Sequence, residues 1–185
     1  MDYRSNEDYY WRERWYSADN ARGLYNGTTS IVFSDEGSEP VTLADVLAWG
    51  KIDQNTDNAL ITALITTARI MCEHYTNTSL VTRTVAAAIN NANGGFILPY
   101  GPVTNTPTAT NFEGTALTLT YNFNQVQNPL GRMTVTYEAG FTTVPEIYKT
   151  AIMQQTLYLY EHRGDEKSGM APLACTLLNP LIRQK

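Results

Sequence analysis

Apolar residues recur every three or four positions between residues 57 and 76, the period of one face of an α-helix. This spacing predicts a long amphipathic helix. Arg69 and Glu73, with Thr62 and Thr66, fall on the opposite side and are expected to face solvent. The apolar stripe consists of Leu60, Ile61, Leu64, Ile65, Ala68, Met71, Cys72 and Tyr75.

A second long helix is predicted from Pro145 to Gly164. Proline suits the first helical position, where its missing N–H leaves no bond unmade. A short helix over residues 43–49 precedes both long helices, with Thr42 as its N-cap and Asp45 in its first turn. The apolar stripe of the second long helix consists of Ile147, Tyr148, Ala151, Ile152, Tyr158, Leu159 and His162.

Alternation of apolar and polar residues predicts strands between the two long helices. Residues 101–116 are rich in Pro, Thr, Asn and Gly and are expected to form a loop. The fold class is therefore α+β: two long packed helices plus a short helix, a small antiparallel β-sheet and a C-terminal apolar helical tail. The predicted strands cover residues 80–90, 96–99, 117–121 and 133–137.

The chain divides by composition into an N-terminal arm (1–39), a core domain (40–164) and a hinge with a C-terminal tail (165–185). The arm is rich in aromatic residues, which disordered segments usually lack. Docking on another subunit or partner is expected, and folding back onto its own domain is the alternative. The aromatic residues that suit an interface are Tyr9, Tyr10, Trp11, Trp15 and Tyr16.

The tail is too apolar to remain in water, so it needs a groove to cover it. We expect the hinge to carry it away from its own domain and onto a partner, with packing on its own core as the alternative. Deletion of residues 170–185 is then expected to leave a folded chain that cannot bind that partner. The tail residues of this predicted interface are Leu173, Leu177, Leu178, Leu181, Ile182 and Arg183.

Charge and composition exclude several classes of protein. The formal net charge is −5, and the arm, with four arginines and eight acidic residues, holds −4 of it. No basic stripe is present, which argues against tight binding of DNA phosphates. No apolar run approaches the ~20 residues of a membrane span, and we expect no signal peptide because residues 1–16 contain no apolar segment. Cys72 and Cys175 are expected to be buried, reduced thiols in a cytoplasmic setting.

No catalytic, cofactor-binding or metal-binding set of residues emerges, so an enzyme is not predicted. Nucleophile-elbow, Walker and dinucleotide-binding motifs are all missing. His74 and His162 lie near helix ends, where a histidine satisfies carbonyl groups. Alternating Asp53, Asn55 and Asp57 are similar to a calcium loop but lack its glycine and closing glutamate, so helix capping is the preferred interpretation.

Three stretches stand out by their order and spacing: VTLADV (41–46) with KID (51–53) and the helix start DNALI (57–61); FILPY (96–100) with PV (102–103); and YEAGF (137–141) with VP (144–145), running to YLYEHRG (158–164) and LLNP (177–180). Together they resemble the head–tail connector (adaptor, head-completion) family of tailed bacteriophages. The resemblance covers residues 40–183 and departs from the family in the long arm and in residues 105–127. It implies that the C-terminal helix, here within residues 172–183, reaches onto the portal protein or a neighbouring subunit, so that deletion of residues 170–185 would prevent attachment to portals.

This resemblance implies a structural protein of the virion neck. It would be present in the host cytoplasm during assembly and would join the head after DNA has been packaged. The resemblance also implies a homo-oligomeric ring, a dodecamer matched to the portal protein, with a docking surface for tail, tail-completion or nozzle proteins. DNA would pass through the ring without specific binding. The alternatives are another neck or tail-completion protein, a DNA-packaging accessory subunit and a small cell-wall hydrolase. The last two lack, respectively, a basic recognition helix and a convincing pair of carboxylates.

Overall fold

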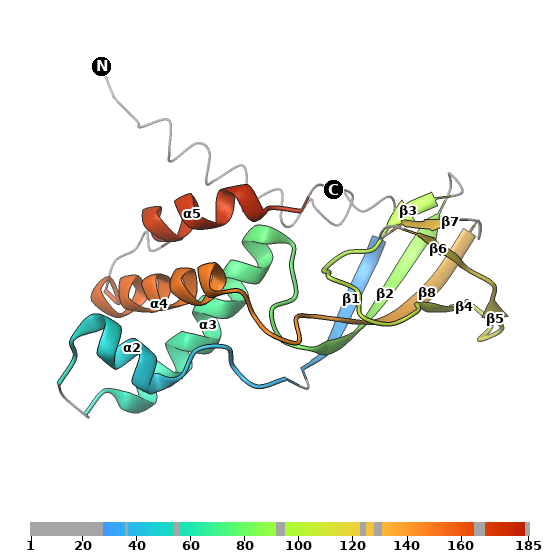
Figure 1. Ribbon diagram of the computed structural model, residues 1–185. Coiled ribbons are helices and arrows are strands. Elements are labelled where there is room, and N and C mark those ends of the chain that lie inside the picture. Colours follow the sequence, from blue (N-terminus) through green and yellow to red (C-terminus); the bar gives the residue numbers. More distant parts are fainter. Residues whose placement is uncertain are drawn as a thin grey trace, which may run out of the picture.

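The structure, a computed structural model, places the helices at one end of the molecule and the strands at the other (Figure 1). It describes residues 28–183 apart from 36, 54–55, 92–94, 123–124, 128–130 and 165–168. Within these residues the fold is α+β, as predicted, with four α-helices and antiparallel β-sheets. The hinge residues 165–168 lie outside the described residues.

The helical end contains α2 (Leu43–Gly50), α3 (Asn58–Thr76), α4 (Glu146–Glu161) and α5 (Pro172–Leu178), followed by a short 3-10 turn, η2 (Asn179–Leu181). The predicted cap of α2 is confirmed. The Asp45 amide donates to Thr42 Oγ1 (3.2 Å), and the Thr42 amide donates to Asp45 Oδ2 (2.8 Å), which completes a capping box. Hydrogen bonds from Thr42 lower the pKa of Asp45.

The apolar stripes of α3 and α4 meet and form a core that α5 also enters. Two of the predicted stripe residues differ: Leu60 on α3 is 40% exposed and Ile147 on α4 is 37% exposed. Each lies in the first turn of its helix, where it extends past the neighbouring helices. The buried side chains from these elements include Ile61, Ile65, Ala68, Cys72, Ala151, Ile152, Ala174, Cys175 and Leu178.

The strands form two sheets. A five-stranded sheet has the order β1–β2–β8–β4–β5, and a three-stranded sheet has the order β3–β7–β6. Their bounds are β1 Thr28–Asp35, β2 Arg83–Asn91, β3 Gly95–Ile97, β4 Thr108–Asn111, β5 Ala116–Leu117, β6 Thr120–Asn122, β7 Gln125–Gln127 and β8 Gly131–Ala139. The loop predicted over residues 101–116 is therefore only partly a loop, because β4 pairs with β8.

The central pair of the larger sheet is β2 and β8, in register from Arg83 opposite Ala139 to Asn91 opposite Gly131. Alternate residues of both strands point inward and are buried against the smaller sheet, which contributes Phe96 and Val126. The Tyr137 hydroxyl donates to the carbonyl oxygen of Pro99 and satisfies the polar end of this buried ring. The β end thus has its own core, separate from the helical one.

Strand β1 comes from the segment that the sequence assigned to the N-terminal arm. It pairs with β2 from Thr28 opposite Ile89 to Asp35 opposite Arg83. Ile31 and Phe33 pack on the β core, while Val32 between them points outward and is 65% exposed. Residues 28–35 therefore belong to the sheet, because alternate apolar residues bury one face once β2 supplies a partner.

Candidate interaction surfaces

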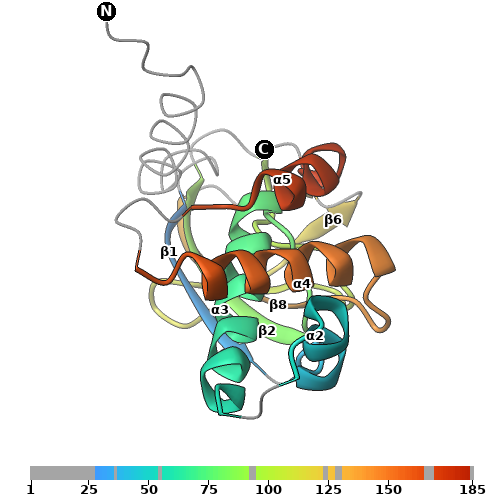
Figure 2. The ribbon, with the colours of Figure 1, turned by 90° about the vertical axis from the view of Figure 1, so that its left-hand side faces the viewer.

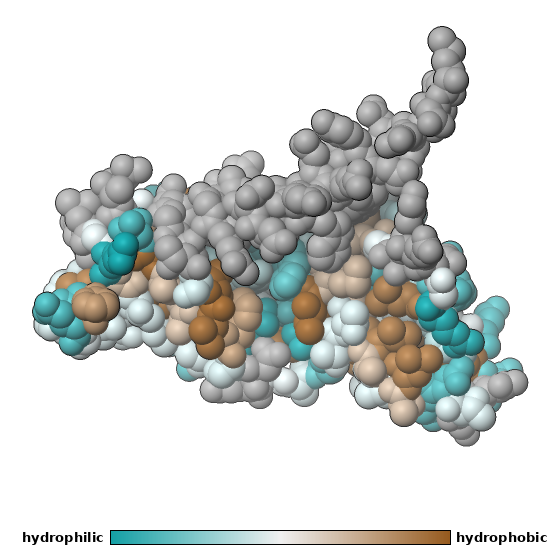
Figure 3. Space-filling view, turned by 180° about the vertical axis from the view of Figure 1, so that it is seen from behind, coloured by the Kyte–Doolittle hydropathy of each residue, from teal (hydrophilic) through white to brown (hydrophobic). Residues whose placement is uncertain are grey.

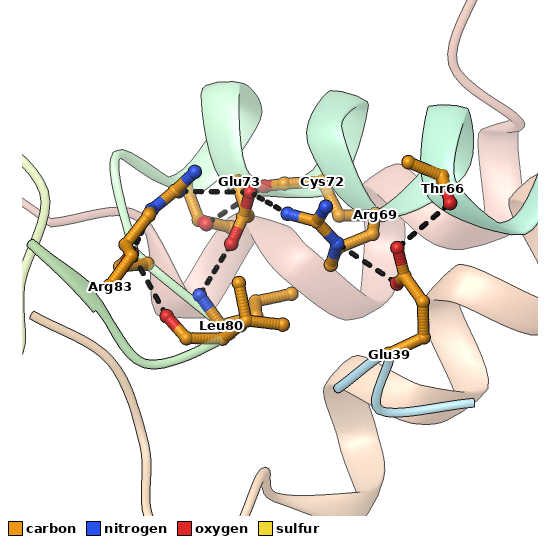
Figure 4. A network of polar contacts seen from close by, with 10 residues as sticks. Glu39, Thr66, Arg69, Cys72, Glu73, Leu80 and Arg83 are labelled. Carbon is orange, nitrogen blue, oxygen red and sulfur yellow. Dashed lines mark hydrogen bonds and ion pairs between the residues drawn. The ribbon is translucent and has the colours of Figure 1, made fainter. Parts of the chain in front are cut away.

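Arg69 and Glu73, predicted to face solvent, are buried, with exposed fractions of 4% and 1%. Figure 4 shows the contacts that make this possible. One oxygen of Glu73 accepts from Arg69 Nη1 (2.8 Å) and lies 2.9 Å from Arg83 Nη2, and the other accepts from the Leu80 amide (2.6 Å). Arg69 Nε donates to Glu39 (2.9 Å). The buried Arg69, Glu73 and Arg83 and the partly exposed Glu39 thus neutralise one another.

This ion network connects parts of the chain that are distant in sequence. Glu39 precedes α2, Arg69 and Glu73 lie on α3, and Arg83 begins β2. The Arg83 guanidinium also lies over the Phe33 ring of β1, 4.3 Å from its centroid. A buried charge without its partner is costly, so the network holds the helical end and the sheet in one relative arrangement. Its role is structural.

The chain has two histidines and two cysteines, residue types that often bind metals or react. Within the described part of the chain, no group of three His, Cys, Asp or Glu side chains could hold a metal ion. His162 Nδ1 lies 2.9 Å from the Tyr158 carbonyl oxygen, the role expected for it. Burial and the charge of Arg83 lower the pKa of His74, which lies beside Tyr100. Cys72 and Cys175 are buried thiols, and burial raises the pKa of Cys72.

The polar turn before α3 differs in one detail from the capping interpretation. Asp57 occupies the N-cap position but its side chain makes no capping bond. Its Oδ2 instead accepts from the Tyr160 hydroxyl (2.6 Å) and lies 3.5 Å from Arg163 Nη1. The carboxylate therefore ties the start of α3 to the end of α4. Asn55, the middle residue of the calcium-like pattern, lies outside the described residues.

Most residues of the predicted tail interface pack against the chain's own helical core. Leu178 is fully buried, Leu177, Leu181, Ile182 and Arg183 are partly buried, and Leu173 is 48% exposed. Helix α5 packs on α4 and α3 (Figures 1 and 2). In the single chain, the tail thus takes the alternative position, and α5 leaves one apolar residue, Leu173, open for a contact with another molecule.

Hydrogen bonds hold the tail at both of its ends. Before α5, the buried Gln155 side chain accepts from the Ala171 amide (2.7 Å) and donates to the Gly169 carbonyl (3.0 Å). After α5, the Tyr75 hydroxyl donates to Asn179 (2.5 Å), and the Arg183 amide donates to the last residue of α3, Thr76 (3.0 Å). The tail is therefore built into the helical end by bonds as well as by apolar burial.

The aromatic residues of the predicted arm interface, Tyr9, Tyr10, Trp11, Trp15 and Tyr16, lie outside the described residues. Some exposed apolar side chains among the described residues were not indicated by the sequence patterns. Trp49 on α2 is 47% exposed, and Phe112 in the turn between β4 and β5 is 89% exposed. Periodicity cannot find such residues, because an apolar side chain inside a predicted element is expected to be buried. None of the described helices is long and apolar enough to cross a membrane.

Neither a family model nor a curated protein matches this sequence. The fold, however, is similar to chains in solved structures of gene transfer agent (GTA) particles. One comes from the neck of an empty GTA particle computed with C6 symmetry. Its TM-score is 0.65 at 16% sequence identity, and the match covers 83% of this chain and 96% of that chain.

Two further chains match over the same shares of both chains. One comes from the virion of a native gene transfer agent particle, with a TM-score of 0.64 and 18% identity. The other comes from the neck of a native particle computed with C12 symmetry, with a TM-score of 0.60 and 16% identity. At these identities the likeness is one of fold. It extends over nearly the whole of the similar chains, so the helical end and the sheets are shared together.

Proposed function

We propose that this protein is a structural, non-enzymatic component of the neck of a phage-like particle. The observation that carries the proposal is the shared fold, which spans 96% of chains found in the necks of gene transfer agent particles. The head–tail connector resemblance in residues 40–183 was drawn from the sequence separately and points to the same part of a virion.

Within the neck, the role we propose is that of the connector: a dodecameric ring beneath the portal that extends the DNA channel and presents a docking surface to tail proteins. The C6 and C12 symmetries of the similar structures support a ring of this kind. A net charge of −5 supports a channel through which DNA passes without being held, because like charges repel and no counterion release favours binding.

The proposed portal contact is the outward side of α5, with the aromatic N-terminal arm reaching a neighbouring subunit or another partner. Leu173 is the exposed apolar residue of α5, and Arg183, which follows η2, is partly buried. Deleting residues 170–185 is no longer a clean test, because Ala174, Cys175 and Leu178 are part of the core. Leu173→Asp removes the exposed contact alone and is expected to abolish attachment to portals.

The decisive experiment is electron microscopy of the full chain mixed with cognate portal-bearing particles that lack tails. A ring of twelve copies on the portal vertex is expected. Leu173→Asp should leave particles bare, whereas Thr118→Asp, at an exposed position between two strands, should not. Binding elsewhere in the neck would favour another neck or tail-completion protein. Wild-type chain that stays unattached would contradict the proposal.

A further inference from the structure

Helix α3 carries its charges on the inside. Its only Asp, Glu, Lys or Arg residues are Arg69 and Glu73, and both are buried. A helix at a protein surface ordinarily turns its charges outward. The outward positions of α3 instead hold apolar residues, threonines and one histidine: Ala59, Leu60, Thr62, Ala63, Thr67, Ile70 and His74. Leu60 and Ile70 are 40% and 38% exposed, so the helix presents apolar side chains both in its first turn and beyond its middle.

Strand β1 extends this uncharged surface to the β end of the molecule. Its exposed residues are Ser30, Val32 and Ser34, and among the described strands it pairs only with β2, so no described strand covers its other edge. Figure 2 shows β1 and α3 along the same side of the molecule, and Figure 3, which looks onto that side, shows hydrophobic residues over both ends. An open strand edge and an apolar helix face are features that proteins normally cover.

In the proposed ring of identical copies, symmetry restricts what can cover the α3 and β1 side of each copy. Identical copies related by a closed rotation contact one another through two different surfaces, one on each side of the subunit. Figure 2 places α2 on the side opposite α3 and β1. The outward residues of α2 include Ala44, Ala48 and Trp49, and Trp49 is 47% exposed. Tryptophan is the residue most enriched at the energetic centre of interfaces.

We propose that the α3 and β1 side of one copy packs against α2 of the next copy, and that this contact closes the ring. The inference rests on the proposed function and adds which surfaces join the subunits. Ala59, Ala63 and Thr67 recur every four residues on α3 and leave its surface shallow, so the Trp49 ring of a neighbouring copy can approach the helix backbone.

Two single variants of the full chain test the contact. Thr67→Glu places a carboxylate in the middle of the α3 surface, and Trp49→Ala removes the aromatic from α2. Each is expected to raise the protein concentration needed for rings on portal-bearing particles by at least about tenfold. Glutamate is a better helix former than threonine, and the Thr67 hydroxyl bonds only within its own helix, to Ala63, so the fold is retained. Circular dichroism checks this, and Thr118→Glu is the matched control.

Two introduced cysteines, one on each proposed surface, test directly whether the surfaces touch, because contact allows a disulfide bond to form. A chain carrying both Thr67→Cys and Ala48→Cys should form disulfide-linked multimers under mild oxidation, whereas each single variant should stop at dimers or monomers. The native cysteines are buried and do not compete. A ladder of linked copies from the double variant alone supports the contact, and its absence in assembled rings would refute it.

The outcomes separate this inference from the proposed function. Failure of the wild-type chain to form rings on portals would contradict the proposed function itself. Normal rings from Thr67→Glu would overturn the α3 contact while leaving that function intact. Loss of rings with Thr67→Glu but not with Trp49→Ala would remove α2 as the occupant. Deletion of residues 1–27 would then show whether the aromatic arm of a neighbouring copy covers α3 instead.

Discussion

Glu73 is the residue on which the internal geometry of this protein depends. Its carboxylate is 1% exposed and contacts Arg69, Arg83 and the Leu80 amide. A carboxylate this deep is tolerated because its oxygens receive charged and backbone donors, as Figure 4 shows. The surrounding residues come from α3, from β2 and from the turn between them. The Glu73 side chain therefore links the helical end of the molecule to the β end.

Replacing Glu73 with alanine is expected to lower the free energy of unfolding by about 3–5 kcal/mol, because two arginines then remain buried with too little negative charge. Urea denaturation measures this. The control is Glu146→Ala: its carboxylate is 83% exposed, so loss of its ion pair with Lys149 should cost less than about 1 kcal/mol. Equal effects of the two variants would mean that the buried network contributes no more than a surface pair.

Gly140 is a second residue that no other amino acid can replace without strain. Its φ is +134°, and a Cβ atom there would lie 2.4 Å from the Val81 carbonyl oxygen. Gly140→Ala should therefore lower the unfolding free energy by more than about 1 kcal/mol in thermal or urea denaturation. Gly164→Ala, where a Cβ meets nothing within 4 Å, should change it little. A neutral Gly140→Ala would indicate that the junction between β8 and α4 relaxes.

At the scale of elements, α5 shows how one short helix divides its residues between two tasks. Leu178, Ala174 and Cys175 are buried against α3 and α4, while Leu173 on the outer side is 48% exposed. The helix is too short to be stable on its own, so its formation depends on this packing. Its inner side therefore serves stability, and only its outer side is free to serve the proposed portal contact.

The two sides of α5 predict opposite results for one substitution. Leu178→Ala should lower the unfolding free energy by about 2–5 kcal/mol, because it leaves a cavity in the core. Leu173→Ala should cost well under half as much, because that side chain is already half in water. Thermal denaturation of both variants measures the difference. Similar losses at the two positions would mean that α5 sits differently on the helical core.

At the scale of the whole molecule, two separate cores are joined into one body. The helical core and the β core share no buried side chains, and the ion network and the strand–helix connections link them. The surface carries few charges, since only 17% of all residues are Asp, Glu, Lys or Arg, and some of these are used inside. A surface with few charges suits a protein that is covered on several sides in an assembly.

The closed helical core predicts that thiol reagents modify the native chain slowly. Cys72 and Cys175 are buried in it, and burial raises the pKa of Cys72 and suppresses its reactive thiolate. A chromogenic disulfide reagent should therefore titrate both thiols only in denaturant. Immediate reaction of either thiol in the native protein would show that the helices open readily.

The charge of the molecule predicts that it does not grip duplex DNA. The net charge is −5, and phosphate binding requires clustered basic residues. Fluorescence anisotropy with a labelled duplex at about 150 mM salt should show no tight binding, either for the chain or for its assembled ring. Tight binding there would support a role in DNA packaging in place of a passive channel.

Sequence periodicity by itself determined the four helices, the central strands β2 and β8 and the α+β class. It could do so because each of these elements buries one side, and that demand is written into neighbouring residues of the same segment. The cap of α2 was predictable for the same reason, since Thr42 and Asp45 bond to each other across one helical turn.

Only the tertiary structure decided the rest, because the partners lie far apart in sequence. Arg69 and Glu73 are paired within one helix, and Glu39, 30 residues before Arg69, and Arg83 at the start of β2 supply their further charged partners. β1 became a strand because β2 offered an edge, and β4 did so because β8 offered another. The tail settled on its own core because α3 and α4 together form the groove that covers Leu178. Because Arg69 and Glu73 are buried, the exposed side of α3 has no Asp, Glu, Lys or Arg, and this is the side that we propose a neighbouring copy covers.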